Sequence, residues 1–207
     1  MLPIKETEYT FGRNYNMSLY LKLGTVQSRK TANMLMTIHE YESSSKPILI
    51  LKPSRDTRNI GYIYTRAGLD KRECDVFHNE VELLRFIEPL DKRVTIFIDE
   101  VQFCSEQECE IIKAVAQKNN ILCYGLLSDY TGKTFPAIAT LMAEMPSIEW
   151  VKSMCSFCDN AAKMNLRTID KKPVYEGDPI APETGYGKDE YWKVCVKCYH
   201  NPPSLVD

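Results

Sequence analysis

The sequence is 207 residues long, 44% of its residues are apolar, and its formal net charge is −2. This length and composition suit one α/β domain with a small appendage. The charge offers no broad positive field for a nucleic-acid backbone or an anionic membrane, and no apolar run approaches the roughly 20 residues that span a bilayer. We therefore expect no membrane partner and disfavour a nucleic-acid partner.

The N-terminal residues 1–16 mix charged and polar groups without the continuous apolar segment of a secretory signal. We interpret them as a flexible N-terminal extension, because the first alternating apolar pattern begins only after Met17. The missing signal predicts a cytoplasmic protein in a reducing environment. There, single cysteines are usually small buried hydrophobes, whereas cysteines in C-x-x-C pairs indicate metal binding.

Strands and helices are expected to alternate along the first part of the chain. Apolar residues alternate from Leu19 to Leu23, which predicts a strand that ends at Gly24, and a helix is expected from Lys30 to Glu42. The short apolar runs 47–52, 94–98 and 121–127 predict parallel strands that are buried on both faces. A helix is expected between the last two strands, with Cys109, Ile112, Val115 and Ala116 on one face.

This alternation predicts an α/β fold with a parallel sheet that is covered by helices on both sides. Residues 60–77 show a mixed pattern, for which we expect a hairpin or flap. After about Met145 the periodic pattern ends and the chain becomes rich in proline and glycine. We therefore divide the chain into the extension 1–16, an α/β nucleotide-binding domain 17–148 and a small second unit 149–207.

Residues 21–33, L-K-L-G-T-V-Q-S-R-K-T-A-N, resemble a phosphate-binding loop. Gly24 follows a predicted strand and Lys30 and Thr31 open a predicted helix, which is the context that gives G-x-x-x-x-G-K-[ST] its meaning. Backbone amides would bind phosphate, the lysine would reach the β and γ phosphates, and the threonine would help to hold Mg²⁺. The predicted phosphate-binding residues are Gly24, Thr25, Val26, Gln27, Ser28, Arg29, Lys30 and Thr31.

Arg29 occupies the position where such a loop has its second glycine. A non-glycine residue at a positive φ costs on the order of 1–2 kcal/mol, which a folded loop can absorb. An arginine directed into the loop would occupy phosphate space, whereas one directed outward would be harmless or would add a charged contact. The motif alone also fits a simple glycine turn before a helix with an incidental lysine.

Two carboxylates follow the predicted strand in I-F-I-D-E. At the carboxyl edge of a parallel sheet Asp99 would lie close to a magnesium ion held by Thr31, and Glu100 would accept a proton from an attacking hydroxyl. The simpler interpretation is an acidic pair at the start of a loop. The aromatic residues Phe103, Tyr130 and Phe135 also follow predicted strand ends, where ligands of open sheets bind, although the pattern by itself favours core packing.

Two C-x-x-C pairs, Cys155 with Cys158 and Cys195 with Cys198, provide four thiolates. Each pair can hold two corners of a tetrahedron, and zinc is the natural occupant. All four ligands come from protein, so the predicted zinc is structural rather than catalytic. The long intervening loop would be pinned at both ends, which would hold Tyr191 in place.

The order of these motifs resembles the type II thymidine kinases. The matching segments are G-x-x-x-x-x-K-T, L-K-P-x-x-D-T-R (51–58), I-D-E-x-Q-F (98–103), Y-G-L-x-x-D-Y (124–130), the first C-x-x-C and Y-x-x-V-C-x-x-C-Y (191–199). The resemblance implies a RecA-like fold with a zinc-bearing lasso, usually assembled as a tetramer. It also implies transfer of the γ-phosphoryl group of ATP to the 5′-hydroxyl of thymidine, with deoxyuridine as a second candidate acceptor. We accordingly expect a homotetramer or homodimer.

The resemblance also implies roles for individual residues. Glu100 would be the catalytic base, Arg58 would lie near the phosphates, and Asp99 would be the magnesium-associated carboxylate. The nucleoside-binding residues would be Phe103, Tyr130, Phe135 and Tyr191. This sequence departs from the family at Arg29 and at Tyr186, which replaces a lasso glycine.

Two other hypotheses remain beside an active kinase. A catalytically impaired nucleoside or nucleotide binder would keep its ligand but exclude ATP because of Arg29. A zinc-ribbon ATPase acting on nucleic acid would require a basic surface and salt-dependent binding. We favour the active kinase, because the lysine, the threonine, both carboxylates and the lasso tyrosine are all retained.

Overall fold

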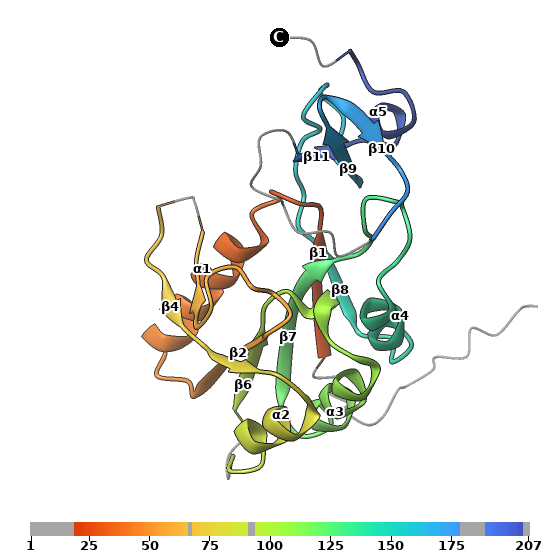
Figure 1. Ribbon diagram of the computed structural model, residues 1–207. Coiled ribbons are helices and arrows are strands. Elements are labelled where there is room, and N and C mark those ends of the chain that lie inside the picture. Colours follow the sequence, from red (N-terminus) through yellow and green to blue (C-terminus); the bar gives the residue numbers. More distant parts are fainter. Residues whose placement is uncertain (1–18, 66–67, 91–93, 179–188, 205–207) are drawn as a thin grey trace, which may run out of the picture.

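The computed structural model describes residues 19–65, 68–90, 94–178 and 189–204. Its centre is a six-stranded sheet in the order β5-β2-β6-β7-β1-β8 (Figure 1). Every pair of neighbouring strands in it is parallel, which confirms the predicted parallel sheet. The strands are β1 (Leu19–Gly24), β2 (Ile48–Pro53), β5 (Asp75–Phe77), β6 (Thr95–Ile98), β7 (Asn120–Leu126) and β8 (Ser147–Trp150). The predicted extension 1–16 lies outside the described residues.

Helices cover both faces of the sheet, as the alternation of elements predicts. Successive side chains of β7 point to opposite faces. Leu122 and Tyr124 pack in one hydrophobic cluster with Met34 and Ile38 of α1, whereas Cys123 belongs to a second cluster that contains residues of the other three helices. These helices are α1 (Lys30–Ser43), α2 (Glu80–Ile87), α3 (Glu106–Ala116) and α4 (Pro136–Met142).

The start of α3 shows how local sequence fixes an element. Ser105 Oγ accepts a hydrogen bond from the amide of Glu108 at 3.2 Å, and Glu108 Oε2 accepts one from the amide of Ser105 at 2.6 Å. This capping box satisfies two amides that the helix leaves unpaired. Cys109, Ile112 and Ala116 are buried as expected, and Val115 is partly buried.

The burial predicted for the run 47–52 is wrong for the first half of the strand. Ile48, Leu49 and Ile50 are only half-buried. The reason is the short edge strand: β5 pairs with β2 only from Leu51 to Pro53, so the preceding residues of β2 have a neighbouring strand on one side only. Strand β6, in contrast, is buried along its whole length.

The predicted hairpin within residues 60–77 is confirmed. Strands β3 (Tyr62–Ile63) and β4 (Arg72–Glu73) pair antiparallel, and Ile63 is fully buried. The segment then returns to the main sheet as β5, which the sequence pattern does not predict. This return places the hairpin beside the carboxyl ends of the central strands.

The C-terminal unit contains a three-stranded antiparallel sheet in the order β10-β9-β11. Its elements are β9 (Met164–Ile169), β10 (Lys172–Val174), β11 (Asp189–Val194) and α5 (Val196–His200). Leu166 and Val194 are fully buried beside the cysteines and form its small core. The boundary that we predicted between 148 and 149 falls within β8, which pairs with β1.

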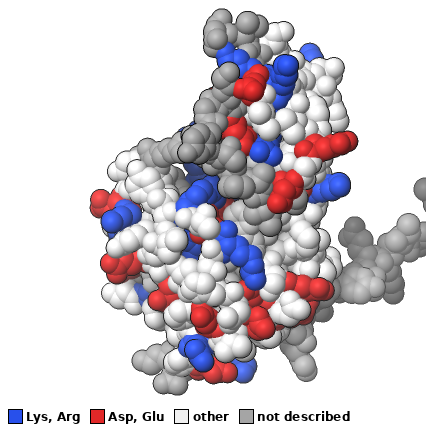
Figure 2. All heavy atoms as spheres, viewed as in Figure 1, with Lys and Arg blue, Asp and Glu red and all other residues white. Residues whose placement is uncertain are grey.

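No helix within the described ranges is both long enough and apolar enough to cross a membrane. On the face shown in Figure 2, basic and acidic side chains are interspersed rather than gathered by sign. This distribution agrees with the small net charge of the sequence.

Candidate active site

The loop between β1 and α1 is held in an unusual backbone conformation. Gln27 and Arg29 have φ values of 53° and 69°, in the left-handed region that favours glycine. Arg29 is the residue immediately before α1, and its side chain is exposed. Arg29 therefore adopts a glycine-like backbone conformation, and its exposed side chain lies at the cavity described below.

Gly24 is needed at the start of this loop because of close packing. A Cβ at this position would lie 2.4 Å from Ser28 Oγ and 3.1 Å from the carbonyl oxygen of Val151. Ser28 is 1% exposed, and its hydroxyl has no hydrogen-bond partner among the described residues. A buried hydroxyl without a partner in a phosphate-loop sequence is consistent with a ligand that completes the site.

Lys30 begins α1 and is buried at 8% exposure. Its Nζ donates to the carbonyl oxygen of Thr25 at 2.8 Å, so that the ammonium lies beneath the loop. Desolvation lowers the pKa of Lys30, while Glu100 and Asp99 act in the opposite direction. A buried cation that faces two carboxylates is well placed for a polyanionic ligand.

Asp99 and Glu100 follow β6 at the carboxyl edge of the sheet. Asp99 is 5% exposed, and burial together with the neighbouring Glu100 raises its pKa to about 7. Glu100 has a φ of 50°, and its carboxylate accepts hydrogen bonds from Arg58 Nη2 at 2.9 Å and from Gln102 Nε2. Strained backbone of this kind persists where the surroundings fix it, and it concentrates at functional sites.

Gln102 connects this carboxylate to β7. Its Oε1 accepts a hydrogen bond from the amide of Leu126 at 3.0 Å. A Cβ at Gly125 would lie 2.7 Å from the same Oε1, so the glycine of Y-G-L provides the space for this side chain. Gln102 belongs to a motif that we quoted, but we did not predict it as a site residue.

Arg58 is held by a chain of ionic contacts at the other side of Glu100. Arg58 Nε donates to Asp56 Oδ1 at 2.8 Å, and Lys52 Nζ lies 2.9 Å from Asp56 Oδ2. Although burial alone would raise the pKa of Asp56, hydrogen bonds from Arg58 and Lys52 lower it. Lys52 and Asp56 were not predicted, although the segment L-K-P-x-x-D-T-R contains both.

A cavity of about 480 Å³ joins these groups. It brings together the predicted residues from Val26 to Thr31 with Arg58, Asp99 and Glu100, whereas Gly24 and Thr25 do not line it. The remaining lining residues come from the end of β2, the segment after it, the hairpin and the end of β7: Lys52, Asp56, Asn59, Tyr62, Tyr64, Thr65 and Leu126.

The predicted nucleoside-binding aromatics form two pairs and do not line this cavity. Phe103 and Phe135 meet edge to face, with ring centres 6.3 Å apart. Tyr130 and Tyr191 do the same at 6.1 Å, across the contact between the main sheet and the C-terminal unit. Arg167, which we did not predict, contacts both tyrosine rings.

The C-terminal unit is bonded directly to the phosphate loop. Asn165 Oδ1 accepts a hydrogen bond from the amide of Val26 at 2.8 Å, and Gln27 Nε2 donates to the carbonyl oxygen of Tyr191 at 3.1 Å. Asn165 also donates to the carbonyl oxygen of Ser128 at 2.7 Å. No local pattern marks Asn165, because its partners are distant in sequence.

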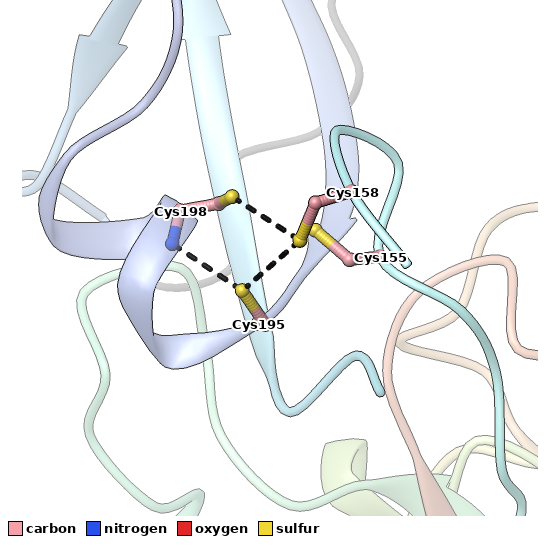
Figure 3. Close-up of side chains that lie close together, drawn as sticks. All are labelled: Cys155, Cys158, Cys195 and Cys198. Atoms are coloured by element: carbon pink, nitrogen blue, oxygen red, sulfur yellow. Dashed lines mark hydrogen bonds between the residues drawn. The ribbon is translucent and has the colours of Figure 1, made fainter. Parts of the chain in front are cut away.

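The four predicted zinc ligands form one cluster (Figure 3). The Sγ atoms of Cys155, Cys158, Cys195 and Cys198 lie within 4.8 Å of one another. Cys158 Sγ is 3.6 Å from Cys195 Sγ and 3.7 Å from Cys198 Sγ. Zn–S bonds of about 2.3 Å would place the sulfurs of a regular tetrahedron about 3.8 Å apart. The cluster therefore fits a zinc ion.

The thiol chemistry of the cluster agrees with this geometry. The amide of Cys198 donates to Cys195 Sγ at 3.4 Å and, together with the neighbouring thiols, lowers the pKa of Cys195 to about 7. Burial and the neighbouring thiols raise the pKa of Cys198 to about 12, so the four thiols do not all favour the thiolate before an ion binds. Zinc binds the thiolate form. Tyr186 and the middle of the predicted lasso lie outside the described residues.

Fold and site together define an α/β protein with a parallel central sheet flanked by helices and a cysteine cluster that could hold zinc. A family model described as "Thymidine kinase" matches residues 17–199. The chain is 36% identical over 188 residues to the thymidine kinase of Streptococcus pyogenes serotype M6, covering 89% of this chain and 97% of the relative. It is 34% identical over the same length, with the same coverage, to that of Streptococcus agalactiae serotype Ia. The chain belongs to the thymidine kinase family, whose members are phosphotransferases that use ATP.

Proposed function

We propose that the chain transfers the γ-phosphoryl group of ATP to the 5′-hydroxyl of thymidine, and also of deoxyuridine, in nucleotide salvage. The observation that carries this proposal is the shared cavity at the carboxyl edge of the sheet. It is lined by residues of the phosphate loop, including Lys30, and by Arg58, Asp99 and Glu100. These are the groups that phosphoryl transfer requires: a phosphate cradle, cations, a carboxylate for magnesium and a base.

In the proposed reaction Glu100 accepts the proton of the 5′-hydroxyl while the oxygen of that hydroxyl forms a bond to the γ phosphorus. The bond from the γ phosphorus to the bridging oxygen breaks, and ADP leaves. Arg58 and Gln102 support this step because both donate to the carboxylate of Glu100 and so fix its orientation. Lys30 would give up its bond to Thr25 in favour of phosphate oxygens.

Thr31 and Asp99 are the residues that would hold magnesium, which neutralises charge on the β and γ phosphates when bound. The raised pKa of Asp99 supports this assignment, because a buried carboxylate beside Glu100 is stabilised by an added cation. Phe103, Phe135, Tyr130 and Tyr191 would contact the acceptor nucleoside. Zinc on the cysteine cluster would fix the ends of the lasso that carries Tyr191.

The proposal includes the organisation of the chain. Residues 17–148 would form the nucleotide-binding domain and residues 149–207 the zinc-bearing lasso domain, preceded by the extension 1–16. We further propose that the protein is cytoplasmic and forms a homotetramer or homodimer, in agreement with the assembly that the family resemblance implies.

Arg29 motivates a second candidate, a binder of nucleosides that does not transfer phosphate. The favouring observation is that Arg29 lines the cavity beside Lys30 and Thr31, where its side chain would compete with phosphate for space. The retained Lys30, Asp99 and Glu100, which line the same cavity, favour the active enzyme instead.

Incubation of the purified protein with thymidine and Mg-ATP, followed by chromatography of the products, tests the two candidates. The active enzyme forms thymidine monophosphate and ADP in equal amounts. Lys30→Met and Glu100→Gln should each reduce turnover at least about 100-fold, whereas Lys118→Met, which changes an exposed lysine, should leave it unchanged. Thymidine binding without product would establish the non-catalytic binder.

A further inference from the structure

Arg167 lies within β9, where its guanidinium is nearly enclosed. The side chain is 10% exposed, and that of its partner Asp189 is 5% exposed. Arg167 Nε donates to Asp189 Oδ1 at 2.9 Å, and Nη2 donates to Oδ2 at 2.7 Å. This two-point contact fixes the plane of the guanidinium as well as its position.

The fixed guanidinium contacts both tyrosines of the cluster. Arg167 Nη1 donates to the hydroxyl oxygen of Tyr130 at 3.3 Å. Its Cζ lies 5.1 Å from the ring centre of Tyr130 and 5.8 Å from that of Tyr191. Both distances are within the range of cation–π attraction. One charged group therefore orients the two rings.

The strand register explains why these side chains meet. Arg167 is directly opposite Tyr191 in the antiparallel pairing of β9 with β11. Asp189 and Tyr191 are two residues apart on β11 and so share a face with Arg167. Thr168 points to the other face, where its Oγ1 accepts a hydrogen bond from Trp192 Nε1 at 3.1 Å.

The backbone near the rings has supports that are independent of Arg167. The carbonyl oxygen of Tyr191 accepts a hydrogen bond from Gln27 Nε2, and the carbonyl oxygen of Tyr130 accepts one from the hydroxyl of Tyr199 at 2.9 Å. The Tyr130 hydroxyl also donates to the carbonyl oxygen of Glu176 at 3.2 Å. Loss of the guanidinium would therefore remove its contacts with both rings while these hydrogen bonds remain.

We propose that Arg167 is a positioning residue for the acceptor nucleoside, because it holds the rings of Tyr130 and Tyr191 in the orientation that receives the base. This proposal rests on the nucleoside-binding role given above to the two tyrosines. The residues proposed above for the phosphate donor form a different group, and within the described ranges Arg167 makes no hydrogen bond or ion pair with them, so we expect its main effect on the acceptor.

Steady-state kinetics on the full chain tests this proposal with three variants. Arg167→Met keeps a long apolar side chain without the charge. Arg167→Lys keeps the charge without the planar fork that makes the two-point contact. Thr168→Val is the matched control, because it replaces the adjacent side chain, which lies on the opposite face, with one of nearly the same size. Zinc content and the urea midpoint of unfolding are measured for each.

Arg167→Met should raise the KM for thymidine about tenfold, the loss expected for a desolvated cation–π contact, while the KM for ATP stays within about twofold. Arg167→Lys should give a smaller increase in the same direction, and it decides the question if the methionine variant does not fold. Thr168→Val should change the urea midpoint without changing either KM.

An unchanged KM for thymidine, or an equal loss of affinity for thymidine and ATP, would show that Arg167 only supports the fold and would overturn the proposal. Failure of the proposed function is a separate result, because the wild-type chain itself would then form no thymidine monophosphate.

Discussion

Replacing Arg29 with glycine should stabilise the fold while weakening ATP binding. The φ of 69° at Arg29 costs about 1–2 kcal/mol for a residue with a Cβ, and glycine removes this cost. Glycine also gives the unfolded chain additional freedom, which offsets about 0.5–1 kcal/mol of the gain. We therefore expect the free energy of unfolding to rise by about 0.5–1 kcal/mol.

The kinetic effect of the same change comes from charge. The guanidinium is exposed at the edge of the cavity and makes no side-chain hydrogen bond with a described residue. A solvent-screened contact with phosphate is worth up to about 1 kcal/mol, so the KM for ATP should rise about two- to fivefold. This expectation assumes that the arginine contacts the phosphates of ATP rather than obstructing their binding.

Urea unfolding and initial-rate kinetics of Arg29→Gly and Arg29→Ala separate the two effects. Both variants lose the charge, but only alanine keeps the strained Cβ. Glycine should therefore be more stable than alanine, while both show the same increase in the KM for ATP. A glycine variant no more stable than alanine would refute the strain argument, and a lower KM for ATP would show that Arg29 crowds the loop.

Three further changes test other contacts. Asp56→Ala should lower the free energy of unfolding, measured by urea denaturation, by about 3 kcal/mol, because the buried Lys52 loses the carboxylate with which it pairs. A loss below about 1 kcal/mol would contradict this expectation. Cys195→Ser should reduce both zinc content, measured by elemental analysis, and thymidine affinity, and retention of both would argue against a pinned lasso. Gly24→Ala should cost about 1–3 kcal/mol of unfolding free energy through its contact with Ser28 Oγ. Adding Ser28→Ala should restore part of this loss, and no recovery would locate the clash elsewhere.

Residues in compact motifs could be predicted because their chemistry is local. Gly24, Lys30 and Thr31 lie within one strand-to-helix turn, and Asp99 and Glu100 directly follow the buried strand β6. Parallel strands bring such ends to one edge of the sheet, so their common cavity follows from the element order. The four cysteines were predictable for the same reason, since each C-x-x-C pair is a local unit.

The supporting residues could not be predicted, because their partners are remote. Arg167 meets Asp189 and Tyr130 only after β9 and β11 pair in the observed register. Asn165 reaches the amide of Val26 across 139 positions of sequence. Neither has a periodicity or spacing that distinguishes it from a surface residue.

The conformation of Arg29 also depends on the folded loop. Sequence shows that the glycine is missing, but only the structure shows that the arginine takes up the left-handed φ and lies exposed at the cavity. The short helices α2 and α4 were missed for a related reason. They contain only 8 and 7 residues, so a helical period is difficult to recognise before the sheet is in place.

Calorimetric titration of the protein with a non-hydrolysable ATP analogue and Mg²⁺ tests the central claim most directly. We predict saturable binding at one site per chain, which Lys30→Met should weaken strongly and Lys118→Met should not change. If the protein shows no heat of binding with either ATP or the analogue while thymidine still binds, the loop between Gly24 and Thr31 is not a triphosphate site and the proposed phosphoryl transfer is wrong.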